Sequence, residues 1–401
     1  MECALLYGRR RAVSLRTNRW FAVVLAIAIC GLGVAAITHW LLVDSDYVQR
    51  KVGVSAQNST DCPGAFNDAE ISTVISDSHY NSNPTGFVDS LGHIHVFYRV
   101  GTGNSQGQTA ISHAVSNNNG ASWSISKVTL PSAPANYVPQ NERCVLLRNG
   151  TLAMFITMTY SAGVPNQHSY FATSTDYGNS FSRWTLVPET PFYTGSSSVG
   201  VTATDIREGQ NGELLMTVDG WLSSSDTYRS SVLYKSSSLG DTWTTQTIAS
   251  APSTRDYSET TLTCWVSGSN AVTLEAWIRD ENGGGTNGKL WYSTSTDDGA
   301  TWSSLTEVTP PKYMRSLPDV FRIGNCALIT YRGNARGGTT MRAISHNNGK
   351  SWDSSATLYE NFYEYAHTIY NSNQNAILTI LAYSSRAGIQ SGTCKVVLRG
   401  H

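Results

Sequence analysis

The sequence is poor in charged residues, which make up 14% of its 401 residues and leave a formal net charge of −1. A protein that binds a phosphate backbone needs a basic excess, so no nucleic-acid partner is expected. The chain is instead rich in Gly, Tyr and Trp, with 34, 20 and 11 of them. This composition favours strands and turns over helices.

Cysteine is also scarce, and its positions show no spacing typical of metal ligands. Five of the seven cysteines lie beyond residue 60, at Cys62, Cys144, Cys264, Cys326 and Cys394. Cys144, Cys264 and Cys326 fall within apolar strand patterns, so we expect them to be buried free thiols. His93 and His95 alternate on one predicted strand without a third ligand, and we interpret them as residues of one strand face. No metal or other cofactor is expected.

Residues 20–43 form one long apolar segment without a charged residue, long enough to cross a hydrocarbon core. Asp44 and Asp46 follow it, and it is preceded by Arg9, Arg10, Arg11, Arg16 and Arg19. This asymmetry places the N-terminus inside, and a cleaved signal peptide would have a shorter apolar core. We therefore expect a single-pass type II membrane protein, with a cytoplasmic tail over 1–19, a transmembrane helix over 20–43, a stalk over 44–64 and an extracellular or lumenal domain over 65–401.

A pattern of the form Ser-x-Asp-x-Gly-x-x-Trp recurs along the chain. Its copies are Ser116–Trp123, Ser174–Phe181, Ser236–Trp243, Ser295–Trp302 and Ser345–Trp352. The short polar side chain can accept hydrogen bonds from nearby backbone, and the Gly tolerates positive φ, so the pattern predicts a hairpin turn. Five copies of one turn indicate a repeat architecture.

A second kind of hairpin, with apolar strands around a Gly or Asn turn, alternates with these boxes. Its six copies are Phe87–Tyr98, Cys144–Met158, Ile206–Val218, Leu262–Ile278, Val320–Tyr331 and Thr368–Tyr383. A final strand at Cys394–Leu398 belongs to the last unit, and Ala69–Ile75 is positioned to complete that unit from the N-terminal side. Such closure between chain ends protects the edges of a β-propeller.

The boxes resemble the Asp-box (BNR) repeats of the sialidase, or neuraminidase, superfamily, from about residue 65 to the end of the chain. The resemblance implies an all-β fold, a six-bladed β-propeller, here with an N-terminal single transmembrane helix. In that family the boxes lie at the blade periphery, and proteins without catalytic activity carry them too. The boxes are therefore expected to be structural.

The ligand site of a propeller is expected at the rim where first strands start and second strands end. Arginines at the second-strand ends are Arg99, Arg279, Arg332 with Arg336, and Arg386. Residues at the first-strand starts are Glu142, Asp205, Glu259, Asp319 and Tyr365. Guanidinium groups bind carboxylates in bidentate fashion, so this rim would suit a sugar that carries a carboxylate.

The resemblance also implies roles for particular residues: an Arg triad that binds the carboxylate of sialic acid, a Tyr nucleophile assisted by a Glu, and an Asp acid/base. Tyr365 matches the position of the nucleophile, with Tyr363 as its alternate, and Glu259 matches the Glu. Arg279 matches one triad Arg. Arg336, or in its place Arg332, matches the next.

Two positions depart from the family pattern. No Arg stands at Asn81–Thr85, where the first triad Arg belongs, and Arg99 is the available substitute. Residues 101–108 contain no carboxylate, so the acid/base is assigned to Asp205, with Asp219 as an alternative.

These features predict a sialidase-like glycoside hydrolase that removes terminal sialic acid or a similar acidic sugar from sialylated or other acidic glycans. Two alternatives stay open. The propeller could bind glycans without cleaving them, or it could act on another polysaccharide. The carboxylate that reaches the glycosidic oxygen opposite Tyr365 would separate catalysis from binding alone.

Overall fold

The computed structural model describes residues 71–102, 108–132, 135–160, 167–194, 201–252, 254–266, 272–281, 288–309, 314–323, 326–333, 340–347, 349, 351–353, 356–359, 365–371, 376–384 and 392–400. The regular secondary structure in these ranges consists of β-strands alone. No helix among them is long and apolar enough to cross a membrane. The transmembrane helix predicted over 20–43 lies outside the described residues.

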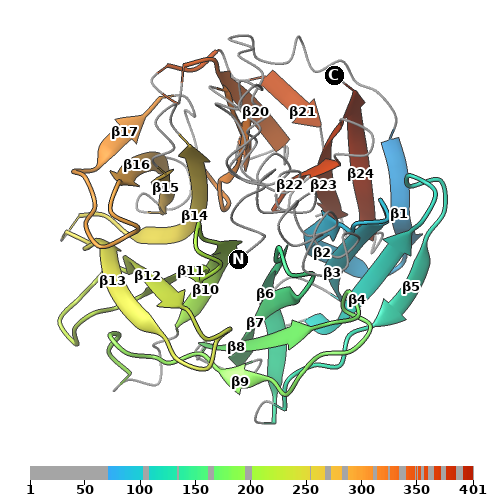
Figure 1. Ribbon diagram of the computed structural model, residues 1–401, viewed down its shortest axis with the longest axis horizontal. Coiled ribbons are helices and arrows are strands. Elements are labelled where there is room, and N and C mark those ends of the chain that lie inside the picture. The colour runs from blue at the N-terminus through green and yellow to red at the C-terminus, as the bar shows by residue number, and fades with distance from the viewer. Residues whose placement is uncertain are drawn as a thin grey trace, which may run out of the picture. The chain divides into compact units, whose positions relative to one another are not determined.

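The strands form six four-stranded antiparallel sheets, arranged around a common centre (Figure 1). The first three sheets are β2 (Tyr80–Val88), β3 (Ile94–Gly101), β4 (Gln108–Ser116) and β5 (Ser124–Lys127); β6 (Tyr137–Leu146), β7 (Leu152–Tyr160), β8 (Gln167–Ser174) and β9 (Thr185–Leu186); and β10 (Thr202–Glu208), β11 (Leu214–Gly220), β12 (Ser230–Ser236) and β13 (Thr244–Ala249). The next two are β14 (Tyr257–Val266), β15 (Val272–Asp280), β16 (Lys289–Ser295) and β17 (Thr306–Val308); and β18 (Asp319–Ile323), β19 (Cys326–Arg332), β20 (Thr340–Ser345) and β21 (Ala356–Tyr359).

The last sheet joins the two ends of the described chain. It contains β22 (His367–Asn371), β23 (Ala376–Ser384), β24 (Gly392–Gly400) and β1 (Ile71–Asp77), in the order β1-β24-β23-β22. The first strands of the six sheets also contact one another in sequence around a ring, from β2 through β6, β10, β14, β18 and β22 back to β2. The structure therefore has the closed all-β propeller architecture that the repeats predicted.

The apolar core lies between adjacent sheets. One cluster joins Ile94 and Tyr98 of β3 to Leu378 and Ile380 of β23, so it seals the junction of the first and last sheets. Other clusters fill the remaining junctions in the same way. Many strands of this core are apolar along most of their length, because both faces of each sheet pack against a neighbouring sheet.

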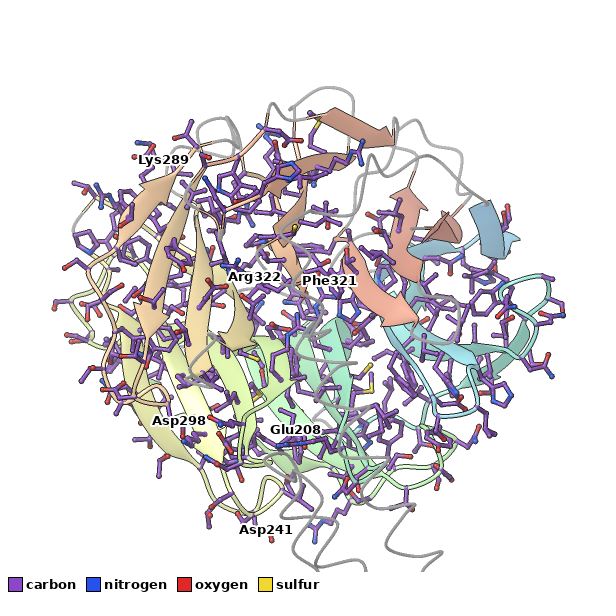
Figure 2. The ribbon with its side chains drawn as sticks, turned by 45° about the horizontal axis from the view of Figure 1, so that its top comes forward. Glu208, Asp241, Lys289, Asp298, Phe321 and Arg322 are labelled. Atoms are coloured by element: carbon purple, nitrogen blue, oxygen red, sulfur yellow. The ribbon has the colours of Figure 1, made fainter. Side chains whose placement is uncertain are left out.

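The five predicted boxes form the turns between the third and fourth strands. In the second box Gly178 N donates to Ser174 Oγ at 2.8 Å and Ser180 N donates to Asp176 Oδ1 at 2.8 Å. The boxes also join blades, because Trp243 of the third box packs edge-on against Phe171 of the preceding sheet, 5.6 Å between ring centroids. Asp241, in the third box turn, lies at the lower edge of the molecule in Figure 2, whereas Arg322 lies nearer the centre.

The cysteines differ in part from the expectation. Cys144 is a buried free thiol, as predicted, and Cys264 is a free thiol but is only partly buried. Cys326 is disulfide-bonded, so the prediction of a free thiol there is wrong. It is the first residue of β19, where a strand end meets other segments, and an apolar strand pattern does not distinguish that position from the middle of a strand.

Candidate active site

A pocket opens where the first strands of the sheets begin, and all six sheets contribute to its wall. Six lining residues lie on β2, β6, β10 and β14, and the other two each stand two residues before β18 or β22. The lining residues are Asn83, Asn141, Glu142, Arg143, Thr204, Glu259, Leu317 and Tyr365. Their convergence follows from the propeller geometry, because each sheet directs the same end of its first strand toward the axis.

Irregularities in the first strands direct these side chains into the pocket. The pairing register shifts between Ser82 and Thr85 in β2 and between Ser258 and Thr260 in β14. Comparable shifts occur in β6 and β10, beside Asn141 and Thr204. A β-bulge of this kind re-aims a side chain and is common next to active sites.

Two bulge residues adopt left-handed backbone conformations. Asn83 has φ 46° and Glu259 has φ 51°. Such a conformation costs a non-Gly residue on the order of 1–3 kcal/mol and persists where the surrounding structure holds it. For Glu259 the strained backbone aims the carboxylate at the pocket.

Tyr365, Glu259 and Arg279 form one hydrogen-bonded cluster, which we call the pocket cluster. The Tyr365 hydroxyl donates to Glu259 Oε1, and Arg279 Nη1 donates to Glu259 Oε2. Arg279 Nη2 donates to Glu281 Oε1 at 3.2 Å. The three residues predicted for the nucleophile, its partner and one triad Arg are thus in direct contact, although they come from two separate sheets.

The electrostatics of the pocket cluster keep Tyr365 protonated. Burial raises the pKa of Tyr365 well above its usual value, the charge of Glu259 raises it further, and Arg279 opposes both. A phenol in this state cannot attack unless its proton is taken at the same time. Glu259 is hydrogen-bonded to that proton and can act as the base.

Glu142 supplies a second carboxyl group to the pocket wall. Burial raises its pKa to about 8, while Arg99 and Arg143 oppose the shift. Arg99 Nε lies 3.8 Å from Glu142 Oε2, beyond hydrogen-bonding distance. Glu142 is therefore protonated at neutral pH and could donate a proton to a bound molecule.

Comparison of the sequence with models of known protein families identifies the family of this chain. A family model described as a BNR repeat-like domain matches residues 135–380. The chain belongs to the BNR repeat-like domain family. No curated protein matches the sequence of this BNR repeat-like chain.

Several solved structures share the fold of this BNR repeat-like propeller. A protein of unknown function from Dyadobacter fermentans has a TM-score of 0.67 at 15% identity, covering 83% of this chain and 99% of its own. The NanB sialidase of Streptococcus pneumoniae has a TM-score of 0.61 at 12% identity, covering 86% and 72%. An α-L-arabinanase of Penicillium chrysogenum, complexed with arabinobiose, has a TM-score of 0.61 at 13% identity, covering 82% and 98%. These similarities show a sialidase-type propeller fold.

The other predicted site residues of the BNR repeat-like chain lie elsewhere. Asp205 Oδ2 accepts hydrogen bonds from Arg207 Nε and from Leu262 N, both at 3.0 Å. It thereby links β10 to β14 of the next sheet and does not line the pocket. Its alternative, Asp219, is buried and pairs with Arg229 at 3.5 Å, and burial raises the pKa of Asp219 to about 7.

Of the predicted arginines that the structure describes, only Arg279 belongs to the pocket cluster, and none of the others lines the pocket. Arg99 is buried against Glu142 behind the pocket wall. Arg332 ends β19, where its backbone N donates to Ser316 Oγ at 2.9 Å. Arg336, Arg386 and the alternate nucleophile Tyr363 lie outside the described residues.

Five pocket residues were missed by the sequence analysis: the apolar Leu317 and the polar Asn83, Asn141, Arg143 and Thr204. Asn83 Nδ2 donates to Asn141 Oδ1 at 2.9 Å across the first two sheets. Arg143 donates from Nη1 to the Pro84 carbonyl at 2.9 Å, so it fixes the same junction. The four polar residues share a sequence position that could have identified them. Each is between the third and the seventh residue of a first strand, near the bulge that interrupts the apolar alternation.

Proposed function

We propose that this protein is a glycosidase of the BNR-propeller type that removes terminal sialic acid or a similar acidic sugar, with Tyr365 as the nucleophile. The observation that carries the proposal is the pocket cluster, in which a buried phenol donates its proton directly to a carboxylate at the pocket wall. A Tyr nucleophile is the known sialidase exception to the use of two carboxylates.

In the proposed first step, Tyr365 Oη attacks the anomeric carbon while its proton passes to Glu259 Oε1. Arg279 holds the other oxygen of Glu259 and keeps the carboxylate aligned. Glu142, protonated because of its burial, gives its proton to the leaving glycosidic oxygen as that bond breaks. In the second step the Glu142 carboxylate takes a proton from water as the water oxygen attacks the anomeric carbon. The bond from that carbon to Tyr365 Oη breaks, and Tyr365 regains its proton from Glu259. The configuration of the sugar is retained overall.

Glu142 takes the acid/base role that the sequence analysis gave to Asp205. The reason is location: Glu142 lines the pocket, whereas Asp205 is bonded to Arg207 and to the backbone of the next sheet. The NanB sialidase fold similarity supports the same substrate class at the level of architecture.

A neutral sugar is the second candidate substrate, and one observation favours it. Two guanidiniums at the site are already bonded: that of Arg279 in the pocket cluster to Glu259 and Glu281, and that of Arg143 in the pocket wall to backbone carbonyls. Amide and hydroxyl groups at Asn83, Asn141 and Thr204 suit sugar hydroxyls. A furanoside such as an arabinoside would need no guanidinium for binding.

The test is release of a fluorophore from an α-sialoside and from an α-L-arabinofuranoside by the full chain, beside Tyr365→Phe. Tyr292→Phe is the matched control, because Tyr292 also donates to a carboxylate, Glu275 Oε1 at 2.7 Å, but lies away from the pocket. We expect sialoside turnover that Tyr365→Phe abolishes and Tyr292→Phe retains. Turnover of the arabinoside alone would transfer the proposal to neutral sugars. Binding of either glycoside without turnover would make the propeller a glycan-binding protein.

We also infer that residues 20–43 anchor the chain and that the propeller faces the extracellular or lumenal side. The support is the uncharged length of the segment and the basic residues that precede it. Protease added to intact membranes should degrade the propeller and spare the N-terminal tail. Protection of the propeller in sealed, right-side-out vesicles would reverse the assignment.

A further inference from the structure

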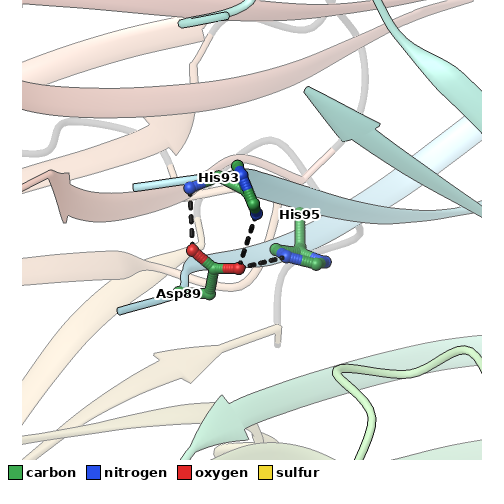
Figure 3. Close-up of side chains that lie close together, drawn as sticks. All are labelled: Asp89, His93 and His95. Carbon is green, nitrogen blue, oxygen red and sulfur yellow. Dashed lines mark hydrogen bonds and ion pairs between the residues drawn. The ribbon is translucent and has the colours of Figure 1, made fainter. Parts of the chain in front are cut away.

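A group of three potential metal ligands lies in the turn that joins β2 to β3 and at the start of β3, at the end of β2 opposite the pocket. Asp89, His93 and His95 each place one ligand atom within 4.8 Å of the others (Figure 3). The sequence analysis noted the two histidines and missed the aspartate. A carboxylate oxygen and two imidazole nitrogens form one of the common ligand sets for Zn²⁺.

The distances between ligand atoms suit a small tetrahedral ion. His93 Nδ1 lies 2.9 Å and His95 Nε2 lies 3.3 Å from Asp89 Oδ2. Ligands bound to Zn²⁺ at about 2.0–2.2 Å are about 3.3 Å from one another in a tetrahedron. The Asp89–His95 distance matches this value and the Asp89–His93 distance is shorter, so admission of the ion would require the His93 ring to move outward.

Surrounding contacts hold two of these ligands in place. Asp89 Oδ1 accepts hydrogen bonds from Leu91 N at 2.9 Å and from His93 N at 2.8 Å, which leaves Oδ2 facing the histidines. His95 Nδ1 lies 3.0 Å from His113 Nε2, and its ring stacks on Phe87 with centroids 4.5 Å apart. Partners of this kind orient a metal-binding imidazole and set which nitrogen carries its proton.

The two sides of the group differ in their access to solvent. The side chains of Asp89 and His95 are 1% and 5% exposed, whereas that of His93 is 32% exposed. The solvent-facing side beside His93 leaves room for entry of an ion and for a water molecule as the fourth ligand.

We propose that Asp89, His93 and His95 form a binding site for one divalent transition-metal ion, with Zn²⁺ as the best match to the ligand set. The site is separate from the pocket, because Asn83 lies near the start of β2 and Asp89 follows its end. A bound ion would tie the β2–β3 turn to the face of β3, so its effect is on the stability of the first blade.

The experiment is metal binding by the full chain, purified without a polyhistidine tag, stripped with a chelator and dialysed against Zn²⁺. His93→Ala is the test variant because His93 is the most exposed ligand, so its loss is the least disruptive to folding. His79→Ala is the matched control, because His79 makes a similar pair with Asp77, Nδ1 to Oδ2 at 3.0 Å, without a second imidazole.

We expect one zinc per chain by mass spectrometry of the metal content in the wild type and in His79→Ala, and none in His93→Ala. Zn²⁺ should also raise the melting temperature of the wild type and of His79→Ala, but not of His93→Ala. No zinc in the wild type, or equal zinc content in His93→Ala, would overturn the proposal.

Discussion

Two clusters with the same three residue types lie in different parts of this propeller. The pocket cluster consists of Tyr365, Glu259 and Arg279. A second one, which we call the interior cluster, consists of Tyr292, Glu275 and Arg322: Tyr292 Oη donates to Glu275 Oε1 at 2.7 Å, and Arg322 Nε donates to Glu275 Oε2 at 2.7 Å.

The carboxylates differ in access and in hydrogen bonding. Glu275 is fully buried on the regular strand β15, and Thr263 Oγ1 also donates to it at 2.7 Å. Glu259 is 13% exposed at its side chain and stands on a bulge with φ 51°. The comparison teaches that a Tyr–Glu–Arg group is structural where its lone pairs are all engaged and sealed, and available for chemistry where a bulge turns it toward a pocket.

Exchange of the carboxylate for an amide gives the largest expected contrast in activity. In Glu259→Gln the base for Tyr365 is lost, so turnover should fall by about 10²–10⁴-fold. Glu275→Gln, measured on the protein that remains folded, should keep its turnover number. Steady-state rates with the better glycoside, corrected for active folded protein, check this, and equal losses in the two variants would erase the distinction between the clusters.

The same pair of variants should behave in the opposite way in unfolding. Glu275→Gln removes the carboxylate that pairs with the buried Arg322, and breaking a buried ion pair typically costs about 3–5 kcal/mol. Glu259→Gln should cost less, because Arg279 keeps its pair with Glu281 and the Glu259 side chain is partly exposed. Denaturant unfolding followed by Trp fluorescence gives both values. A larger cost for Glu259→Gln would contradict the structural role of the interior cluster.

Thr263→Val tests how much the hydrogen bonds of Thr263 contribute to the stability of the interior cluster. The hydroxyl of Thr263 donates to Glu275 and accepts from Trp277 Nε1 at 3.0 Å. Its removal leaves buried polar atoms without a partner, so the free energy of unfolding should fall by about 1–3 kcal/mol. Turnover should be unchanged. A drop in turnover without loss of stability would mean that the interior cluster communicates with the pocket.

The last prediction concerns the pH dependence of turnover and of stability, which Glu142 in the pocket wall should control. Because the pKa of Glu142 is raised to about 8, its acid form is present at neutral pH and is lost above it. Turnover should then fall about tenfold per pH unit above pH 8. The fold should also lose stability as the pH rises from about 4.5 to about 8, since the folded state holds this proton more tightly than the unfolded chain does.

Glu142→Gln provides the control for that profile. It should have low turnover at every pH and a flatter dependence of unfolding free energy on pH. A wild-type profile that stays level from pH 7 to pH 10 would remove Glu142 from the mechanism.

The sequence was sufficient to predict the repeat architecture. Each of the six expected hairpins forms two adjacent strands of one sheet. Cys394–Leu398 falls on β24, and the described part of the predicted range 69–75, from Ile71 on, falls on β1 as its closing partner. These features could be predicted because turn chemistry and apolar alternation are local and repeat along the chain. The disulfide at Cys326 could not be, because pairing depends on which strand ends meet in space.

The site residues likewise fall into those that the sequence predicted and those that only the structure identified. By itself the sequence determined which residues stand at strand starts and ends, and so it predicted Tyr365, Glu259 and Arg279 as site residues, which hydrogen bonds join in the structure. Only the tertiary structure decided that Asp205 joins two sheets, that Glu142 is a buried acid in the pocket wall, and that Asp89 meets His93 and His95. The physical reason is that a bulge or turn changes the direction of a side chain without changing the periodicity that a sequence displays.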